Sequence, residues 1–94
     1  MVRAVNKEIE LLRIFRVTAE CNSFRDAAVR LGTSPQGVTR AIKRLEEHYG
    51  EVLFHRTTRQ VRITAFGEGL LEQVRPDLKR FEDLWRIPGA DQQA

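Results

Sequence analysis

A helix stop and a helix start lie two residues apart near the middle of the chain, and this pair restricts the fold most strongly. Gly32 ends an apolar-periodic stretch, and glycine readily adopts the left-handed conformation in which helices terminate. Ser34 and Pro35 follow after one residue, and a serine cap before a proline at the first helical position is a specific start signal. The sequence therefore predicts two helices joined by a tight turn.

Three amphipathic helices are expected around this turn. One covers residues 7–20, with Asn6 as its cap and Cys21-Asn22 as its end. A second runs from Ser23 to the glycine stop, and a third covers residues 34–48. Their apolar stripes are Ile9, Leu12, Phe15 and Ala19, then Phe24, Ala27, Ala28 and Leu31, then Val38, Ile42 and Leu45. Three such stripes can enclose one small core.

A hairpin and a fourth helix are expected after Gly50, which ends the third helix. Residues 52–64 contain two short β-prone runs around a polar turn at 57–60. Thr64 can cap the fourth helix, which extends to about Arg86. Pro76 either kinks or splits this helix, and we expect a kink because the apolar period continues beyond it. The expected fold class is mainly α, a winged helix-turn-helix with a three-helix core, a two-stranded β wing and a long C-terminal helix.

The length of 94 residues allows one small domain. We expect the winged helix-turn-helix to cover residues 1–64 and a linker or dimerisation helix to cover residues 65–87. Residues 88–94 are small and polar, so we expect a disordered tail there.

Positive charge is concentrated in the middle of the chain. Residues 25–62 contain eight basic and four acidic residues, whereas residues 63–94 contain four basic and six acidic ones. The net charge of the whole chain is only +3, so the distribution is more informative than the total. A clustered basic region is the footprint expected for a polyanionic partner such as nucleic acid.

Few residues are suited to metal binding or catalysis. Cys21 is the sole cysteine and is expected to pack as a small apolar side chain. His48 and His55 have no third ligand near them, so we expect no metal and no cofactor. No catalytic triad or carboxylate pair stands out, which argues against an enzyme. Without a signal peptide or a membrane-length apolar run, the expected location is the cytoplasm.

Three stretches of the sequence resemble the N-terminal domain of LysR-type bacterial transcriptional regulators, in the same order and spacing. The first spans 12–31 and contains Leu12-Arg13-Ile14-Phe15 and Ala19-Glu20-Cys21-Asn22-Ser23-Phe24. The second is Ser34-Pro35-Gln36-Gly37-Val38-Thr39-Arg40-Ala41-Ile42, followed by Leu45-Glu46. The third is Leu53-Phe54-His55-Arg56-Thr57, followed by Arg59, Ile63-Thr64 and Gly67. This resemblance implies sequence-specific binding of double-stranded DNA in transcription regulation.

The polar face of the third helix is the expected DNA-reading surface in the major groove. Gln36 can pair with adenine, Thr39 can contact a base or a thymine methyl, and Arg40 can reach base edges. Ser34 can cap the helix and also bind a phosphate at its N-terminus. The remaining expected contacts on this helix are Pro35, Lys43 and Arg44. The alternative is an ordinary solvated charged face.

The hairpin supplies further expected DNA contacts, at Arg56, Thr58, Arg59 and Arg62. The resemblance assigns minor-groove insertion to Arg59, where A·T-rich sequence attracts cations. The alternative is a charged edge that prevents strand aggregation.

The fourth helix is expected to pair two copies of the chain. Its apolar residues alternate steps of three and four, as in a heptad seam: Leu71, Val74, Leu78, Phe81 and Trp85. LysR-type domains pair through this helix, so we expect a homodimer on an interrupted palindrome. The alternative is that the seam packs back on its own domain.

Family members carry a longer C-terminal domain that binds a small effector, so an effector is expected only with that domain.

A protein-interaction module remains a rival interpretation, because winged helices also dock proteins. Binding that weakens steeply with salt would favour DNA.

Overall fold

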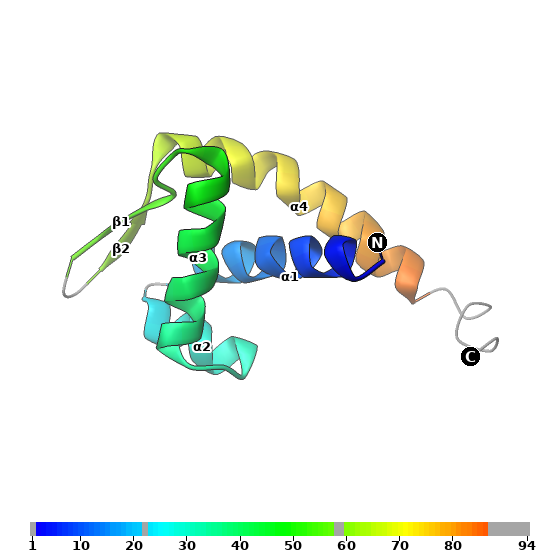
Figure 1. Cartoon of the computed structure of the whole chain (residues 1–94), viewed down its shortest axis with the longest axis horizontal. Helices are drawn as coiled ribbons and strands as arrows, with labels where there is room; N and C mark the ends of the chain where they lie inside the picture. The colour runs from blue at the N-terminus through cyan, green and yellow to red at the C-terminus, as the bar shows by residue number, and fades with distance from the viewer. Residues whose placement is uncertain (1, 22, 58–59, 87–94) are drawn as a thin grey trace.

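The computed structural model describes residues 2–21, 23–57 and 60–86. The order of elements is α1 (Val2–Ala19), α2 (Phe24–Leu31), α3 (Pro35–Tyr49), β1 (Phe54–Arg56), β2 (Val61–Ile63) and α4 (Ala65–Trp85). α3 crosses α1, α2 lies below their crossing, and α4 runs along α1 with the hairpin at its N-terminal end (Figure 1). This arrangement is the winged helix-turn-helix expected from the sequence.

The helix boundaries around the turn agree with the sequence signals. Gly32 has φ 70°, in the left-handed region, and ends α2. Gly50 has φ 69° and ends α3 in the same way. At the N-cap of α2, Ser23 Oγ accepts a hydrogen bond from Asp26 N–H at 3.1 Å. Local residue chemistry therefore sets these helix boundaries.

The expected start of the first helix is wrong. α1 begins at Val2, so Asn6 lies inside the helix and is not its N-cap. Residues 2–5 contain neither glycine nor proline, and an asparagine in a helix interior costs only about 0.7 kcal/mol or less. A continuous helix is therefore compatible with Asn6, and the cap signal did not mark a boundary.

The core lies where the first three helices meet the hairpin. Phe15, Val38, Ile42 and Leu53 are all essentially inaccessible to solvent. The ring of Phe54 lies 5.6 Å from that of Phe15 and 5.9 Å from that of Phe24, measured between centroids. These aromatic contacts attach the hairpin to α1 and α2, so the wing has a fixed base.

Thr64 joins the start of α4 to the base of the hairpin. Its hydroxyl donates to Val52 O at 2.6 Å and accepts from Gly67 N–H at 3.0 Å. A Cβ on Gly67 would lie 2.6 Å from Leu53 O, so only glycine allows this close approach. α4 then continues as one helix through Pro76 (Figure 1), which means that the proline does not split it.

Candidate nucleic-acid interface

The first turn of α3 has a defined cap. Ser34 Oγ accepts a hydrogen bond from Gly37 N–H at 3.0 Å, and Pro35 follows at the first position of the helix. A Cβ on Gly37 would lie 2.8 Å from Thr33 Oγ1, so glycine leaves room for that hydroxyl beside the helix start. Sequence reasoning did not single out Thr33, which is exposed on this turn.

The two faces of α3 differ sharply. Val38, Ala41, Ile42 and Leu45 are buried and hold the helix on the core. The opposite face carries side chains that are exposed or, for Thr39, half-buried: Gln36, Thr39, Arg40, Lys43 and Arg44. In the part of the chain that the structure describes, no ion pair involves the three cations of this face. They are therefore available to an external anion.

The hairpin separates its polar residues between two sides. Phe54 pairs with Ile63, His55 with Arg62, and Arg56 with Val61. Because side chains alternate along a strand, His55 and Arg62 face away from the buried Phe54. Both are exposed, which leaves Arg62 available for contacts outside the protein.

Arg56 lies on the other side of the hairpin, toward α2. Its guanidinium carbon is 5.1 Å from the centroid of the Phe24 ring, a cation–π geometry. The side chain remains exposed and lines a surface hollow of about 410 Å³ between α2 and the hairpin, together with Ser23, Arg25 and Gln60. Sequence reasoning did not identify Arg25, because no local motif relates α2 to the hairpin.

The turn of the hairpin is closed by Thr57 and Gln60. Thr57 N–H donates to Gln60 O at 2.9 Å, and Gln60 N–H donates to Thr57 Oγ1 at 3.0 Å. The expected contacts Thr58 and Arg59 lie outside the described residues, as do Asn22 and the expected tail at 88–94.

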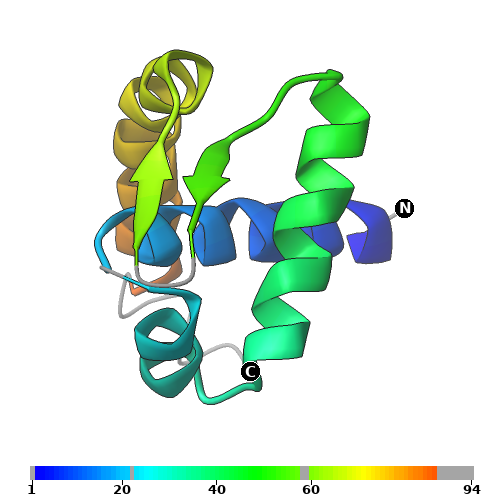
Figure 2. The same cartoon turned by 90° about the vertical axis from the view of Figure 1, so that its left-hand side faces the viewer.

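Figure 2 views the molecule from the side on which the hairpin projects. The hairpin and α3 stand next to each other, with α2 below them. The polar elements that the sequence analysis selected therefore share one end of the molecule, far from the C-terminal end of α4 (Figure 1).

The apolar stripe of α4 is divided in the structure. Val74 and Leu78 are 6% and 4% exposed within the single chain, because α4 packs against α1. Leu71 and Phe81 are half-buried, whereas Trp85 is 72% exposed. The middle of the stripe is therefore buried against its own domain, and the C-terminal end of the stripe is exposed. Leu84, which the seam did not include, is also 58% exposed.

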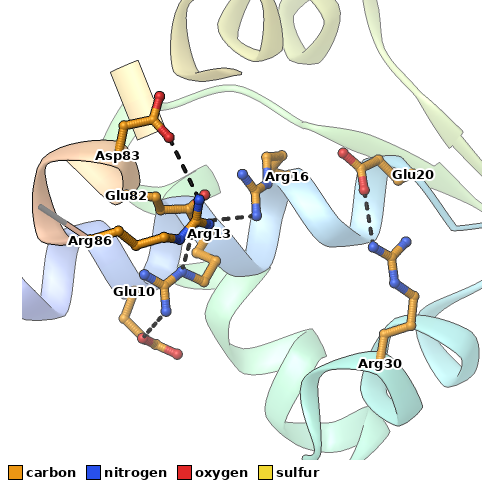
Figure 3. Close-up of polar contacts among 8 residues, drawn as sticks. All are labelled: Glu10, Arg13, Arg16, Glu20, Arg30, Glu82, Asp83 and Arg86. Carbon is orange, nitrogen blue, oxygen red and sulfur yellow. Dashed lines mark hydrogen bonds and ion pairs between the residues drawn. The ribbon is translucent and has the colours of Figure 1, made fainter. Parts of the chain in front are cut away.

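In α2, Arg30 forms contacts within the protein, with residues that follow the end of α1. Its guanidinium donates to Glu20 Oε1 at 3.2 Å (Figure 3) and contacts Cys21 Sγ at 3.7 Å. The hydrogen bond to Cys21, and then that to Glu20, raises the pKa of Arg30 above its ordinary value. This ion pair links the end of α1 to α2. Cys21 itself is half-buried.

We also searched the described ranges for a metal site and for a membrane-spanning helix. They contain no cluster of three or more His, Cys, Asp or Glu side chains arranged for a metal ion. His48 instead contacts the ring of Tyr49, with 4.8 Å between centroids. None of the described helices is both long and apolar enough to cross a membrane.

The chain is similar to known regulators over most of its length. The model of the family described as "Bacterial regulatory helix-turn-helix protein, lysR family" matches residues 9–68. The HTH-type transcriptional regulator y4mQ of Sinorhizobium fredii is 44% identical over 78 residues, which are 83% of this chain and 25% of that protein. The chain therefore spans about a quarter of this relative.

Solved structures of DNA-binding domains have the same fold. The CbnR domain in its DNA complex gives a TM-score of 0.75 at 34% identity, covering 83% of this chain and 93% of that one. The BenM domain in its catB site 1 DNA complex gives a TM-score of 0.79 at 26% identity, covering 90% and 91%. Family match, identity and fold agree, and the chain belongs to the LysR family of bacterial regulatory helix-turn-helix proteins as a winged helix-turn-helix DNA-binding domain.

Proposed function

We propose that this domain reads double-stranded DNA with α3 in the major groove and the hairpin in the adjacent minor groove. The observation that carries the proposal is the exposed face of α3, whose three cations have no ion-pair partner among the described residues. An α-helix fits the width of the major groove, and unpaired cations can replace the counterions of the phosphates.

The residues of α3 have different expected roles in this complex. Arg40 contacts base edges or the neighbouring phosphates, and Gln36 and Thr39 contact bases. Lys43 and Arg44 contact phosphates, which fix the position of the helix without reading sequence. Ser34 has its structural role as the cap, and Pro35 starts the helix at the DNA surface.

The hairpin contributes the minor-groove contacts. Its outward Arg62 contacts the phosphate backbone, and Arg59 enters the groove, with Thr58 beside it. Arg56 contributes from the hollow between α2 and the hairpin, where Arg25 adds a second cation. A·T-rich flanks favour this arrangement because their narrow minor groove has a more negative potential.

Two copies of the chain pair through α4 in this proposal, so that the operator is an interrupted palindrome. Support comes from the exposed Leu84 and Trp85 beside the half-buried Phe81, which leave an apolar surface at the end of the helix. Val74 and Leu78 hold α4 on its own core, and Leu71 borders this contact. Residues 65–87 therefore act as a linker and dimerisation helix beyond the reading domain at 1–64.

The domain binds and does not catalyse, and it acts in the cytoplasm, where a bacterial genome is accessible. An effector enters only if the full-length protein has a further domain, as its longer relatives suggest.

Selection of bound sequences from a random DNA pool tests the proposal directly. We expect a palindromic operator whose affinity falls steeply with salt. If each protomer uses at least Lys43 and Arg44 on phosphates, the slope of log K against log salt is about −3.6 or steeper for a dimer. Recovery of no preferred sequence, or a salt-independent affinity, would reject DNA reading in favour of a protein-docking module.

Trp85→Glu tests the pairing, with Glu72→Gln as an exposed control on the same helix. Sedimentation on the selected palindrome should show two copies for the parent and the control, and one for Trp85→Glu. A parent that stays monomeric on the palindrome contradicts the dimer.

A further inference from the structure

The C-terminal turns of α4 are held less firmly than the rest of the helix. Val74 and Leu78 are buried on α1, but beyond them Phe81 is only half-buried and Leu84 and Trp85 are largely exposed. Apolar packing therefore stops fixing the helix roughly two turns before its end. Whatever sets the direction of these last turns must come from other contacts.

Glu82 supplies such a contact (Figure 3). Its Oε2 atom accepts from Arg16 Nη2 at 3.5 Å and lies 3.7 Å from Arg13 Nε. Both arginines belong to α1. The other ion pairs of α4, Lys79–Asp83 and Arg86–Asp83, remain within the C-terminal end of that helix. In the described part of the chain, Glu82 is thus the ionic link between the end of α4 and the helix-turn-helix.

Arg13, Arg16 and Glu82 are partly shielded from water, so solvent cannot easily substitute for the Glu82 carboxylate. The side chains of Arg13, Arg16 and Glu82 are 37%, 22% and 23% exposed. The Nε atoms of both arginines are buried and have no hydrogen-bond partner. Without Glu82, two guanidiniums on successive turns of α1 would face α4 with no opposite charge from that helix, and the electrostatic attraction that holds the end of α4 against α1 would be lost.

Pro76 gives the helix a place to bend before this link. A proline removes one backbone hydrogen bond of the helix interior, and sharp helix kinks occur mainly at proline. From Pro76 to the end of α4 the helix extends about 15 Å at about 1.5 Å per residue. A change of direction of about 20° there moves the end by about 5 Å, which exceeds the rise of about 3.4 Å per base pair.

We propose that Glu82, held between Arg13 and Arg16, is a positioning residue that fixes the direction of the end of α4 and thereby selects the half-site spacing that a dimer accepts. This inference rests on the proposed pairing through α4. The partner contacts the exposed end of the helix, so the direction of that end determines how far apart the two copies of α3 lie.

The test compares Glu82→Gln, which keeps the shape but removes the charge, with Glu72→Gln on the exposed face of α4. Binding is measured on the selected palindrome and on versions with one or two base pairs added to or removed from its centre. The parent and Glu72→Gln should prefer one spacing about 10-fold over a change of two base pairs. Glu82→Gln should keep its affinity for the best spacing within about 3-fold, but discriminate less than about 3-fold.

A second measurement does not depend on pairing. Spin labels at Val29 and Arg80, in a Cys21→Ala background diluted with unlabelled protein, report the distance between α2 and α4 within one protomer. The distance distribution should broaden in Glu82→Gln and match the parent in Glu72→Gln. If Glu82→Gln keeps the distribution and the spacing preference of the parent, the proposal is wrong. If the parent itself has no spacing preference, the pairing fails, and the distances alone then decide whether Glu82 directs α4.

Discussion

Helices α3 and α4 are both amphipathic and each contains three cations, but they use their charges differently. In α3, Arg40, Lys43 and Arg44 are exposed and take part in no ion pair within the described residues. In α4, Lys79 pairs with Asp83, and Glu82 reaches α1. Arg75 and Arg80 of α4 are likewise exposed without an ion pair among the described residues, so neither the number of cations nor their freedom is sufficient to identify a DNA surface. What distinguishes α3 in our proposal is that its cations lie on the exposed face of the helix that follows the tight turn.

The apolar sides of the two helices differ as well. α3 buries its whole apolar face under the core, whereas α4 buries the middle of its stripe and leaves the C-terminal end exposed. α3 is thus complete within one chain on its apolar side and unsatisfied on its polar side. α4 is incomplete on its apolar side, whose C-terminal end is exposed, which is why we propose pairing there.

The largest expected effect is on the stability of the fold. It tests whether the middle of the apolar stripe of α4 belongs to the core of the single chain. Leu78→Ala should lower the free energy of unfolding by about 2–5 kcal/mol, because a buried leucine is lost and a cavity remains. Urea denaturation measures the change, with Leu84→Ala as the exposed control, expected within about 0.5 kcal/mol of the parent. Equal stability of Leu78→Ala and the parent would mean that α4 does not pack on α1 in solution.

The next effect concerns the free cations of α3. Arg40→Ala should weaken binding to the selected operator by about 1–3 kcal/mol and relax its sequence preference, because a base or phosphate contact is lost. Arg75→Ala removes the same charge from the exposed side of α4 and should change binding much less. Fluorescence anisotropy gives both affinities. Similar losses of DNA affinity in the two variants would show that binding depends on net charge alone and that α3 and α4 contribute equally to it.

A smaller effect is expected at the start of α3. Ser34→Ala removes the hydroxyl that accepts from Gly37 N–H, and caps of this kind contribute about 0.5–2 kcal/mol. Thermal unfolding should show this loss of stability, and Ser34→Asp, which keeps an acceptor, should recover most of it. Because the aspartate adds negative charge at the end of α3 that we propose faces DNA, it should restore folding without restoring DNA affinity. Recovery of both would place the N-terminus of α3 away from phosphates.

The smallest effect is expected for the exposed ion pair of α4. Lys79→Ala removes a pair with Asp83 whose side chains are 75% and 53% exposed, and such helical pairs contribute about 0.3–0.5 kcal/mol. The change in the free energy of unfolding should disappear at high salt, and DNA affinity should stay the same. A loss of DNA affinity comparable with that of Arg40→Ala would extend the reading surface to α4 and remove the contrast between the helices.

The sequence predicted the fold well because its signals are local. Gly32 and Gly50 end helices at the expected positions, and Ser34 and Thr64 start them. Each signal depends on the conformation of one residue and on a hydrogen bond spanning three or four residues. The exception is Asn6, where the same kind of signal had no effect because nothing before it prevents a helix.

The candidate site was predicted less completely. The exposed face of α3 follows from helical periodicity, so Gln36, Arg40, Lys43 and Arg44 could be selected from their spacing alone. Arg25 and the contact of Arg56 with Phe24 were missed, since they depend on how the hairpin lies against α2. Arg59 stays a prediction from the family resemblance.

What the sequence by itself determined is the order of elements and the chemistry of each turn, because backbone preferences and caps act over a few residues. Only the tertiary structure decided which apolar residues of α4 become core, because that depends on the surface that α1 offers to Val74 and Leu78. The tertiary structure also decided that Arg16 and Glu82, which lie 66 positions apart, form an ion pair. A contact between such distant residues requires two helices to pack at one angle, and no local pattern of residues specifies that angle.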